Sequence, residues 1–148
     1  MREILFRGKR EDNGKWVEGY YGQFHNRPIH KGENSHQIFV LMEDATGFGS
    51  MIGGLWHEVV PETVGQYTGL IDKNGTKIFE GDIVRLHIND QYYRSLICYS
   101  GQSCRFTVKT KLCGCWRHYP LNDRQQLNVI GNIHDNPELL KETMNYAR

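Results

Sequence analysis

The chain has 148 residues, of which 39% are hydrophobic and 24% are charged, and its formal net charge is +1. This length predicts one domain, or one domain with a small N-terminal lobe. The small net charge excludes a strong overall attraction to polyanions. The longest apolar run, residues 38–42, is too short to cross a bilayer. Without a secretory signal pattern at the N-terminus, we expect a cytoplasmic protein that contacts no membrane.

The first part of the chain predicts short strands separated by turns. The turn signal Asp12-Asn13-Gly14 lies between the apolar residues 4–6 and the aromatic segment 16–22, which predicts a hairpin. Residues 36–42 and 56–60 predict two further strands. The polar, glycine-containing segments 23–35 and 43–54 predict irregular connections. Together these elements predict an N-terminal β-rich lobe over residues 1–59.

The centre of the chain, residues 60–84, predicts two tight reversals. Asn74-Gly75 lies between two short apolar runs and predicts a hairpin with a two-residue loop, since both residues tolerate positive φ. Gly81 permits a second reversal before the apolar segment 83–88. Pro61 fixes its own φ and predicts a single helical turn or a bend.

Residues 60–148 predict a small antiparallel meander that ends in a helix. Strands are expected at 83–88, 92–99, 104–110 and 127–133, whereas residues 112–122 are expected to be irregular. Asp135 and Pro137 supply a cap and a first helical position, followed by the apolar Leu139 and Leu140. The fold class is therefore mainly β, an SH3-like barrel with an N-terminal lobe and a short C-terminal helix. The two parts could also form one continuous domain.

The cysteines do not form a standard metal-binding pattern. Zinc knuckles favour two residues between paired ligands, and here the spacing is C-x5-C-x8-C-x-C, so only a weak zinc candidate arises. Its four members are Cys98, Cys104, Cys113 and Cys115. Reduced thiols in strands and a turn are the favoured interpretation. We expect no metal site and no cofactor.

No catalytic signature stands out. His57-Glu58 lacks a second histidine four residues on, because that position is Pro61, and the chain has no P-loop. Cys98 or Cys113 could pair with His118 as a nucleophile and base only if the fold brings them within hydrogen-bond reach. We therefore predict a protein that is not an enzyme.

The segment 94–124 is basic and aromatic. It holds six Lys or Arg residues against one acid, Asp123. Cations neutralise phosphates and aromatic rings stack on bases, so a nucleic-acid contact is one hypothesis for this segment. Its candidate residues are Arg94, Arg105, Lys109, Lys111, Arg117 and Tyr119. A solvated strand face or a protein-contact surface is the competing interpretation.

Three blocks of the sequence resemble a known family. They are Phe6-Arg7-Gly8-Lys9 with Trp16-Val17, then residues 61–84, then residues 129–133 with Asn136-Pro137-Glu138. In these blocks the chain is similar to the YopX family of phage and prophage proteins. The resemblance implies a mostly β protein in the cytoplasm of a bacterial host cell, with no assigned activity and no catalytic residues to carry over. It also implies that homo-oligomer formation is a reasonable expectation.

Two functions follow as hypotheses. The first is a phage accessory protein that is not an enzyme and acts through self-assembly or contacts with a host or phage protein. Its contact surfaces would be the loops 43–54 and 112–122. The alternative is a nucleic-acid-binding β-barrel that uses the basic segment 94–124.

Overall fold

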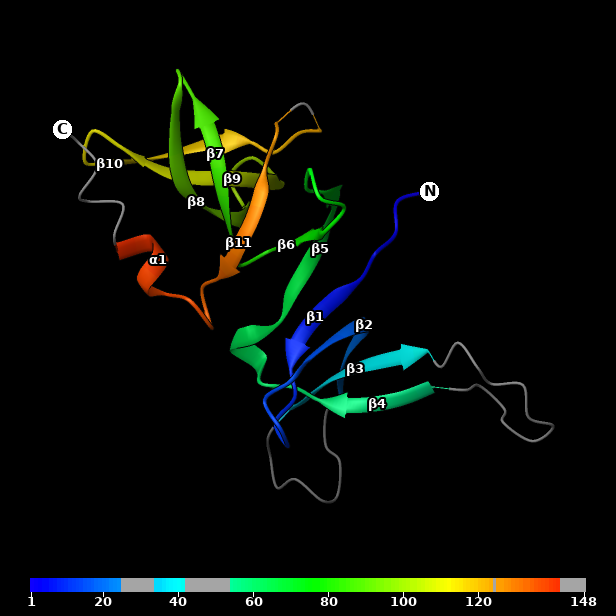
Figure 1. The fold of residues 1–148 in the computed structure, drawn as a ribbon. Helices are drawn as coiled ribbons and strands as arrows, with labels where there is room; N and C mark the ends of the chain where they lie inside the picture. Colours follow the sequence, from blue (N-terminus) through cyan, green and yellow to red (C-terminus); the bar gives the residue numbers. More distant parts are fainter. Residues whose placement is uncertain (25–33, 42–53, 124, 142–148) are drawn as a thin grey trace. The chain divides into compact units, whose positions relative to one another are not determined.

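A computed structural model describes residues 1–24, 34–41, 54–123 and 125–141 (Figure 1). The chain divides into two compact units, Met1–Gln66 and Tyr67–Arg148, and each is described separately below. Nearly all regular structure in both units is antiparallel β-sheet, which confirms the mainly β prediction. No helix in these described ranges is long and apolar enough to cross a membrane.

The first unit is built on a sheet in the order β4-β3-β2-β1. Its strands are β1 (Phe6–Lys9), β2 (Trp16–Phe24), β3 (Ser35–Leu41) and β4 (Gly54–Glu58). The predicted N-terminal hairpin is confirmed, since β1 and β2 pair with Phe6 opposite Gly19. The start of β5 (Gly65–Ile71) adds to the other side of β1, with Phe6 opposite Gln66. Residues 25–33 and 42–53, where connections are predicted, lie outside the described residues.

A small core holds this first sheet together. Ile38 and Val59 are buried, and the chain approaches itself closely at Gly19, where an added Cβ would lie 2.1 Å from Phe39 O. The predicted helical turn is a 3-10 turn at Pro61–Thr63. The Thr63 hydroxyl donates to Val60 O and accepts the Lys9 backbone N–H at 2.9 Å, so this turn is fastened to β1.

The second unit begins with the hairpin of β5 and β6 (Lys77–Phe79), and its turn corrects one prediction. Ile71 pairs with Lys77, so five residues form the loop instead of two. Gly75 has φ +85°, whereas Asn74 keeps negative φ. The reason is Asp72, whose Oδ1 accepts N–H bonds from both Asn74 and Thr76 and so favours the longer turn.

The main sheet of this unit has the order β10-β9-β8-β7-β11. Its strands are β7 (Asp82–Ile88), β8 (Gln91–Ser100), β9 (Arg105–Leu112), β10 (Cys115–Pro120) and β11 (Asn128–Asn132). The regular strand β10 contradicts the prediction that residues 112–122 are irregular. Cys113 and Gly114 both have positive φ and join Leu112 to Cys115 in a two-residue hairpin. Cysteine is an uncommon residue at such a position, so turn-residue preferences do not predict this turn.

The predicted barrel closure is wrong. Among the described residues, β10 pairs only with β9 and β11 pairs only with β7, so the sheet stays open. The closing strand joins the β7 edge, where Val129 N is also held by Asp72 Oδ2 at 3.0 Å. That bond ties β11 to the β5–β6 turn and keeps it on this side of the sheet.

One face of the main sheet forms the core of the second unit. Val84, Ile97 and Val108, from three adjacent strands, are fully buried and pack with Ile78 and Leu127. The chain ends its described part with helix α1 (Glu138–Lys141), which contacts β8 (Figure 1). The predicted C-terminal helix is therefore confirmed.

Candidate functional site

The register of the main sheet decides which side chains share its other face. Lys109 lies opposite Leu96 on β8 and opposite His118 on β10. Residues directly opposite each other in an antiparallel pair point to the same face, and neighbours along a strand alternate. The core residue Val108 therefore faces one way, and Lys109 faces the other.

Cations from three strands, β7, β8 and β9, gather on this second face. Lys111 lies opposite Trp116, and Arg85 on β7 lies opposite Arg94 on β8. Arg105 also lies on this face, because it is four residues before Lys109 along β9 and side chains alternate along a strand. We call this surface the basic face, and its members are Arg85, Tyr92, Arg94, Arg105, Lys109, Lys111, Trp116 and His118.

Two aromatic rings on the basic face are exposed, and a cationic side chain lies over each of them. Tyr92 is 71% exposed and Trp116 is 46% exposed. The Arg85 guanidinium lies 5.9 Å from the Tyr92 ring centre, and Lys109 Nζ lies 5.0 Å from that of Trp116. Such cation–π contacts hold the rings in place beside positive charge. None of Arg105, Lys109 and Lys111 forms an ion pair with a described residue.

The six predicted nucleic-acid residues do not all lie together. Arg94, Arg105, Lys109 and Lys111 share the basic face, with Arg94 next to α1, where its Nη1 donates to Leu139 O at 3.5 Å. Arg117 lies opposite Thr110, and Tyr119 lies opposite Val108. Both therefore point to the face that carries the core. These two candidates therefore do not share a face with the other four, because neighbours along β10 alternate between the two faces.

Sequence reasoning missed Arg85, which lies outside the basic segment 94–124. The signal was present, since β7 buries Val84 and Leu86 while Arg85 and His87 alternate with them. Alternation places Arg85 on the solvent side of the strand, but only the pairing of β7 with β8 sets it opposite Arg94. A segment-based search cannot find a residue contributed by another strand.

The four cysteines do not converge on one metal position. Cys104 directly precedes β9 and Cys113 directly follows it, so the two lie at opposite ends of an eight-residue strand. At about 3.3 Å per residue, the nine steps from Cys104 to Cys113 correspond to roughly 30 Å. Thiolates bound to one zinc ion each lie about 2.3 Å from it. Cys98 lies mid-strand on the basic face, opposite Thr107.

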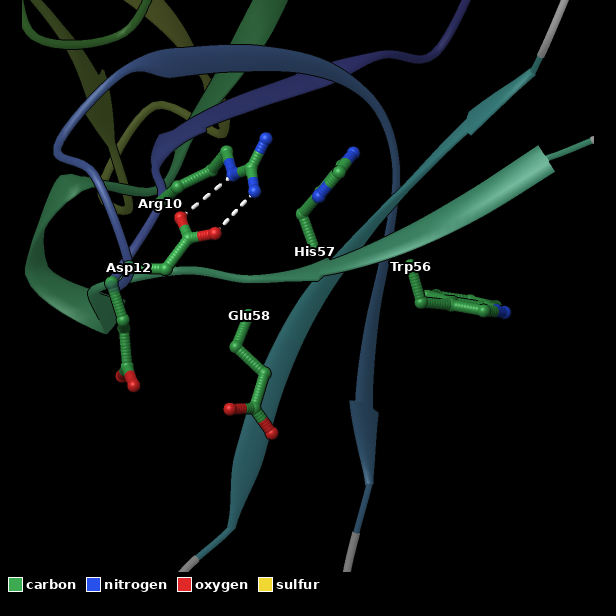
Figure 2. A pocket seen from close by; sticks show the side chains of 6 residues that line it. Arg10, Asp12, Trp56, His57 and Glu58 are labelled. Atoms are coloured by element: carbon green, nitrogen blue, oxygen red, sulfur yellow. Dashed lines mark hydrogen bonds and ion pairs between the residues drawn. The ribbon is translucent and has the colours of Figure 1, made fainter.

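A cavity of about 450 Å³ lies in the first unit, lined by Arg10, Glu11, Asp12, Trp56, His57 and Glu58. Figure 2 shows that Trp56, His57 and Glu58 project from β4 in different directions and share no common centre. Arg10 and Asp12 form an ion pair, and this hydrogen-bonded contact lowers the pKa of the Asp12 carboxyl. Because its charged groups diverge or neutralise each other, we assign no reaction to this cavity.

The buried carboxyl of Asp72, in the second unit, has a structural role. Asp72 is 6% exposed, and its two oxygens accept backbone N–H groups of Asn74, Thr76 and Val129 at 2.8–3.0 Å. Burial by itself raises the pKa of Asp72, but the N–H donors outweigh burial and hold this pKa below its ordinary value of 3.8. Asp72 thus binds the β5–β6 turn to β11.

Comparison with known proteins identifies the family. A model of the YopX protein family matches residues 5–141. The chain belongs to the YopX family. This match spans both units and confirms the resemblance seen in the sequence. No curated protein matches the chain.

The fold of this YopX-family chain is also found in a solved structure. The crystal structure of protein EF1440 from Enterococcus faecalis matches at a TM-score of 0.50 and 23% identity. The match covers 95% of this chain and 99% of that one. At this identity the likeness shows the fold alone.

Proposed function

We propose that this chain binds nucleic acid through the basic face, with single strands as the favoured form. The observation that carries the proposal is the gathering of cations from three strands around two exposed aromatic rings on one sheet face. Cations neutralise phosphates without reading sequence, and exposed rings stack on unpaired bases. Binding of this kind needs no catalytic residue.

The arrangement of charge supports this function better than a merely solvated strand face does. A face exposed to water needs polar side chains of any sign, whereas the basic face carries Lys and Arg at five positions and no acid on β8, β9 or β10. Arg85 and Arg94 lie directly opposite each other. Two cations so placed add to the positive potential of this face.

The test is fluorescence anisotropy of labelled single- and double-stranded oligonucleotides titrated with the whole protein at about 50 and 200 mM salt. We expect binding that weakens steeply with salt, with a stronger complex for single strands. The double variant Arg105→Ala with Lys109→Ala should lower the affinity at least about tenfold and flatten the salt dependence, since each lost phosphate contact reduces the slope.

Arg117→Ala provides the control, because Arg117 is an exposed cation on β10, the strand next to β9, but points to the other face. We expect this variant to bind as the unchanged protein does. A loss of binding free energy in Arg117→Ala half as large as that in the double variant would show that only total charge matters. No binding at low salt would exclude the proposal and leave contact with a host or phage protein, or self-assembly, as the remaining hypothesis.

A further inference from the structure

Cys98, Thr107 and His118 form a cluster across three adjacent strands of the main sheet. The His118 Nδ1 atom lies 3.9 Å from Cys98 Sγ and 3.1 Å from the Thr107 hydroxyl oxygen. The Thr107 hydroxyl also lies 3.4 Å from Cys98 Sγ and donates to Cys98 O at 3.3 Å. A thiol and an imidazole within hydrogen-bond reach, held by a third group, are the usual arrangement of an activated nucleophile.

The small side chain of Thr107 makes this approach geometrically feasible. Cys98 is on β8 and His118 on β10, so the strand β9 with Thr107 separates them. Thr107 is only 3% exposed, although it points to the solvent-facing side of the sheet. The His118 side chain therefore extends over Thr107 toward the sulfur. With its Nδ1 in this cluster, the exposed imidazole is placed to take the thiol proton and pass it to solvent.

The other cysteines lack such a partner. Cys104 is exposed in the turn between β8 and β9, and its Sγ donates to Gly101 O at 3.5 Å. Cys113 and Cys115 flank Gly114 in the next hairpin and are exposed. Among the described residues, a histidine nitrogen therefore lies beside Cys98 alone. Cys98 itself is partly exposed, so a small reagent can reach it.

We propose that Cys98 is a reactive thiol that exchanges with anionic disulfides, with His118 as its proton acceptor. The Cys98 sulfur attacks one sulfur of the disulfide as its proton moves to His118. A Cys98–S–S–R bond forms, the original S–S bond breaks, and the leaving thiolate departs with the electron pair. The proton on His118 then neutralises that thiolate or passes to water. Lys109, directly opposite His118, and Arg105 provide the positive surroundings that favour an anionic reagent.

The test compares two single-thiol forms of the whole protein. The first keeps Cys98 and carries Cys104→Ser, Cys113→Ser and Cys115→Ser. The second keeps Cys104 and carries Cys98→Ser with the same changes at the other two positions. Each is mixed with dithiobis(nitrobenzoate), whose released thiolate absorbs visible light, and with the neutral disulfide dithiodipyridine. His118→Gln is then added to both forms.

We expect His118→Gln to slow the Cys98 reaction at least about tenfold, in line with the loss of a positioned base. The same change should leave the Cys104 reaction unaltered. Preference for the anionic disulfide over the neutral one should be larger at Cys98 than at Cys104, and Lys109→Ala should reduce it. His118 is exposed, so the folded state should persist, which circular dichroism verifies. An unchanged Cys98 rate in the folded His118→Gln form would overturn the proposal.

Discussion

The two faces of the main sheet differ although they belong to the same strands. On one face Val84, Ile97 and Val108 are fully buried and form the core. On the other, residues one position away bear positive charge and exposed rings. Period-two alternation thus separates stability from contact chemistry within single strands. Substitutions at consecutive positions should therefore have effects of different kinds.

The largest difference in the effect of substitution on the free energy of unfolding is expected between the neighbours Val108 and Lys109. Val108→Ala should lower the free energy of unfolding by about 2–4 kcal/mol, because it removes two buried methyl groups and leaves a cavity. Lys109→Ala should change this free energy by less than about 0.5 kcal/mol, since the side chain lies on the solvent side. Urea titration followed by tryptophan fluorescence measures both. Equal losses at the two positions would contradict the division of the sheet into two faces.

Asp72 and the cations of the basic face should respond differently to salt, because Asp72 is a buried charge whereas those cations lie at the surface. Asp72→Ala should cost about 1–3 kcal/mol, since it leaves the buried N–H donors of the β5–β6 turn and β11 without their acceptor. Thermal unfolding in low and high salt measures this loss. We expect it to be independent of salt, in contrast to nucleic-acid binding at the basic face. A loss that vanished in high salt would instead indicate a screened surface interaction.

The pH dependence follows from the lowered pKa of Asp72. A carboxyl with a lower pKa in the folded state contributes stability above its unfolded pKa, near 3.8, and loses it as the pH falls through the folded value. Unfolding free energies measured at a series of acidic pH values should fall in this window. Asp72→Asn cannot titrate, so the fall should be shallower in that variant. The same slope in both proteins would assign the acid sensitivity to other carboxyls.

The smallest expected effect is a gain in the free energy of unfolding on substitution of Thr110. This residue is fully buried, and its hydroxyl has no hydrogen-bond partner in the described part of the chain. Thr110→Val keeps the shape and removes the unsatisfied polar group, so it should raise the free energy of unfolding by about 1 kcal/mol. Urea titration beside Val108→Ala gives a direct comparison. A loss of stability would show that the hydroxyl is satisfied in solution, for example by a buried water molecule.

Local signals predicted most strands, and long-range pairing decided the rest. The apolar and alternating patterns of residues 83–88, 92–99 and 104–110 located β7, β8 and β9, because these patterns act over a few residues. Strand β10 was missed, since its hairpin depends on Cys113 in a conformation that cysteine rarely adopts. Closure into a barrel was wrong because the partner of β11 is set by contacts such as Asp72 with Val129, which are far apart in sequence.

The sequence by itself determined the antiparallel β class, the turns near Gly14 and Gly75, the family and the basic character of residues 94–124. Turn preferences and strand alternation depend on residues close together in the sequence, so a single sequence is enough to predict them. Three placements were decided only by the tertiary structure. Arg85 lies opposite Arg94, Arg117 points away from the basic face, and the His118 side chain extends over Thr107 to Cys98. These placements depend on register between strands, and a shift of one residue would reverse every one of them.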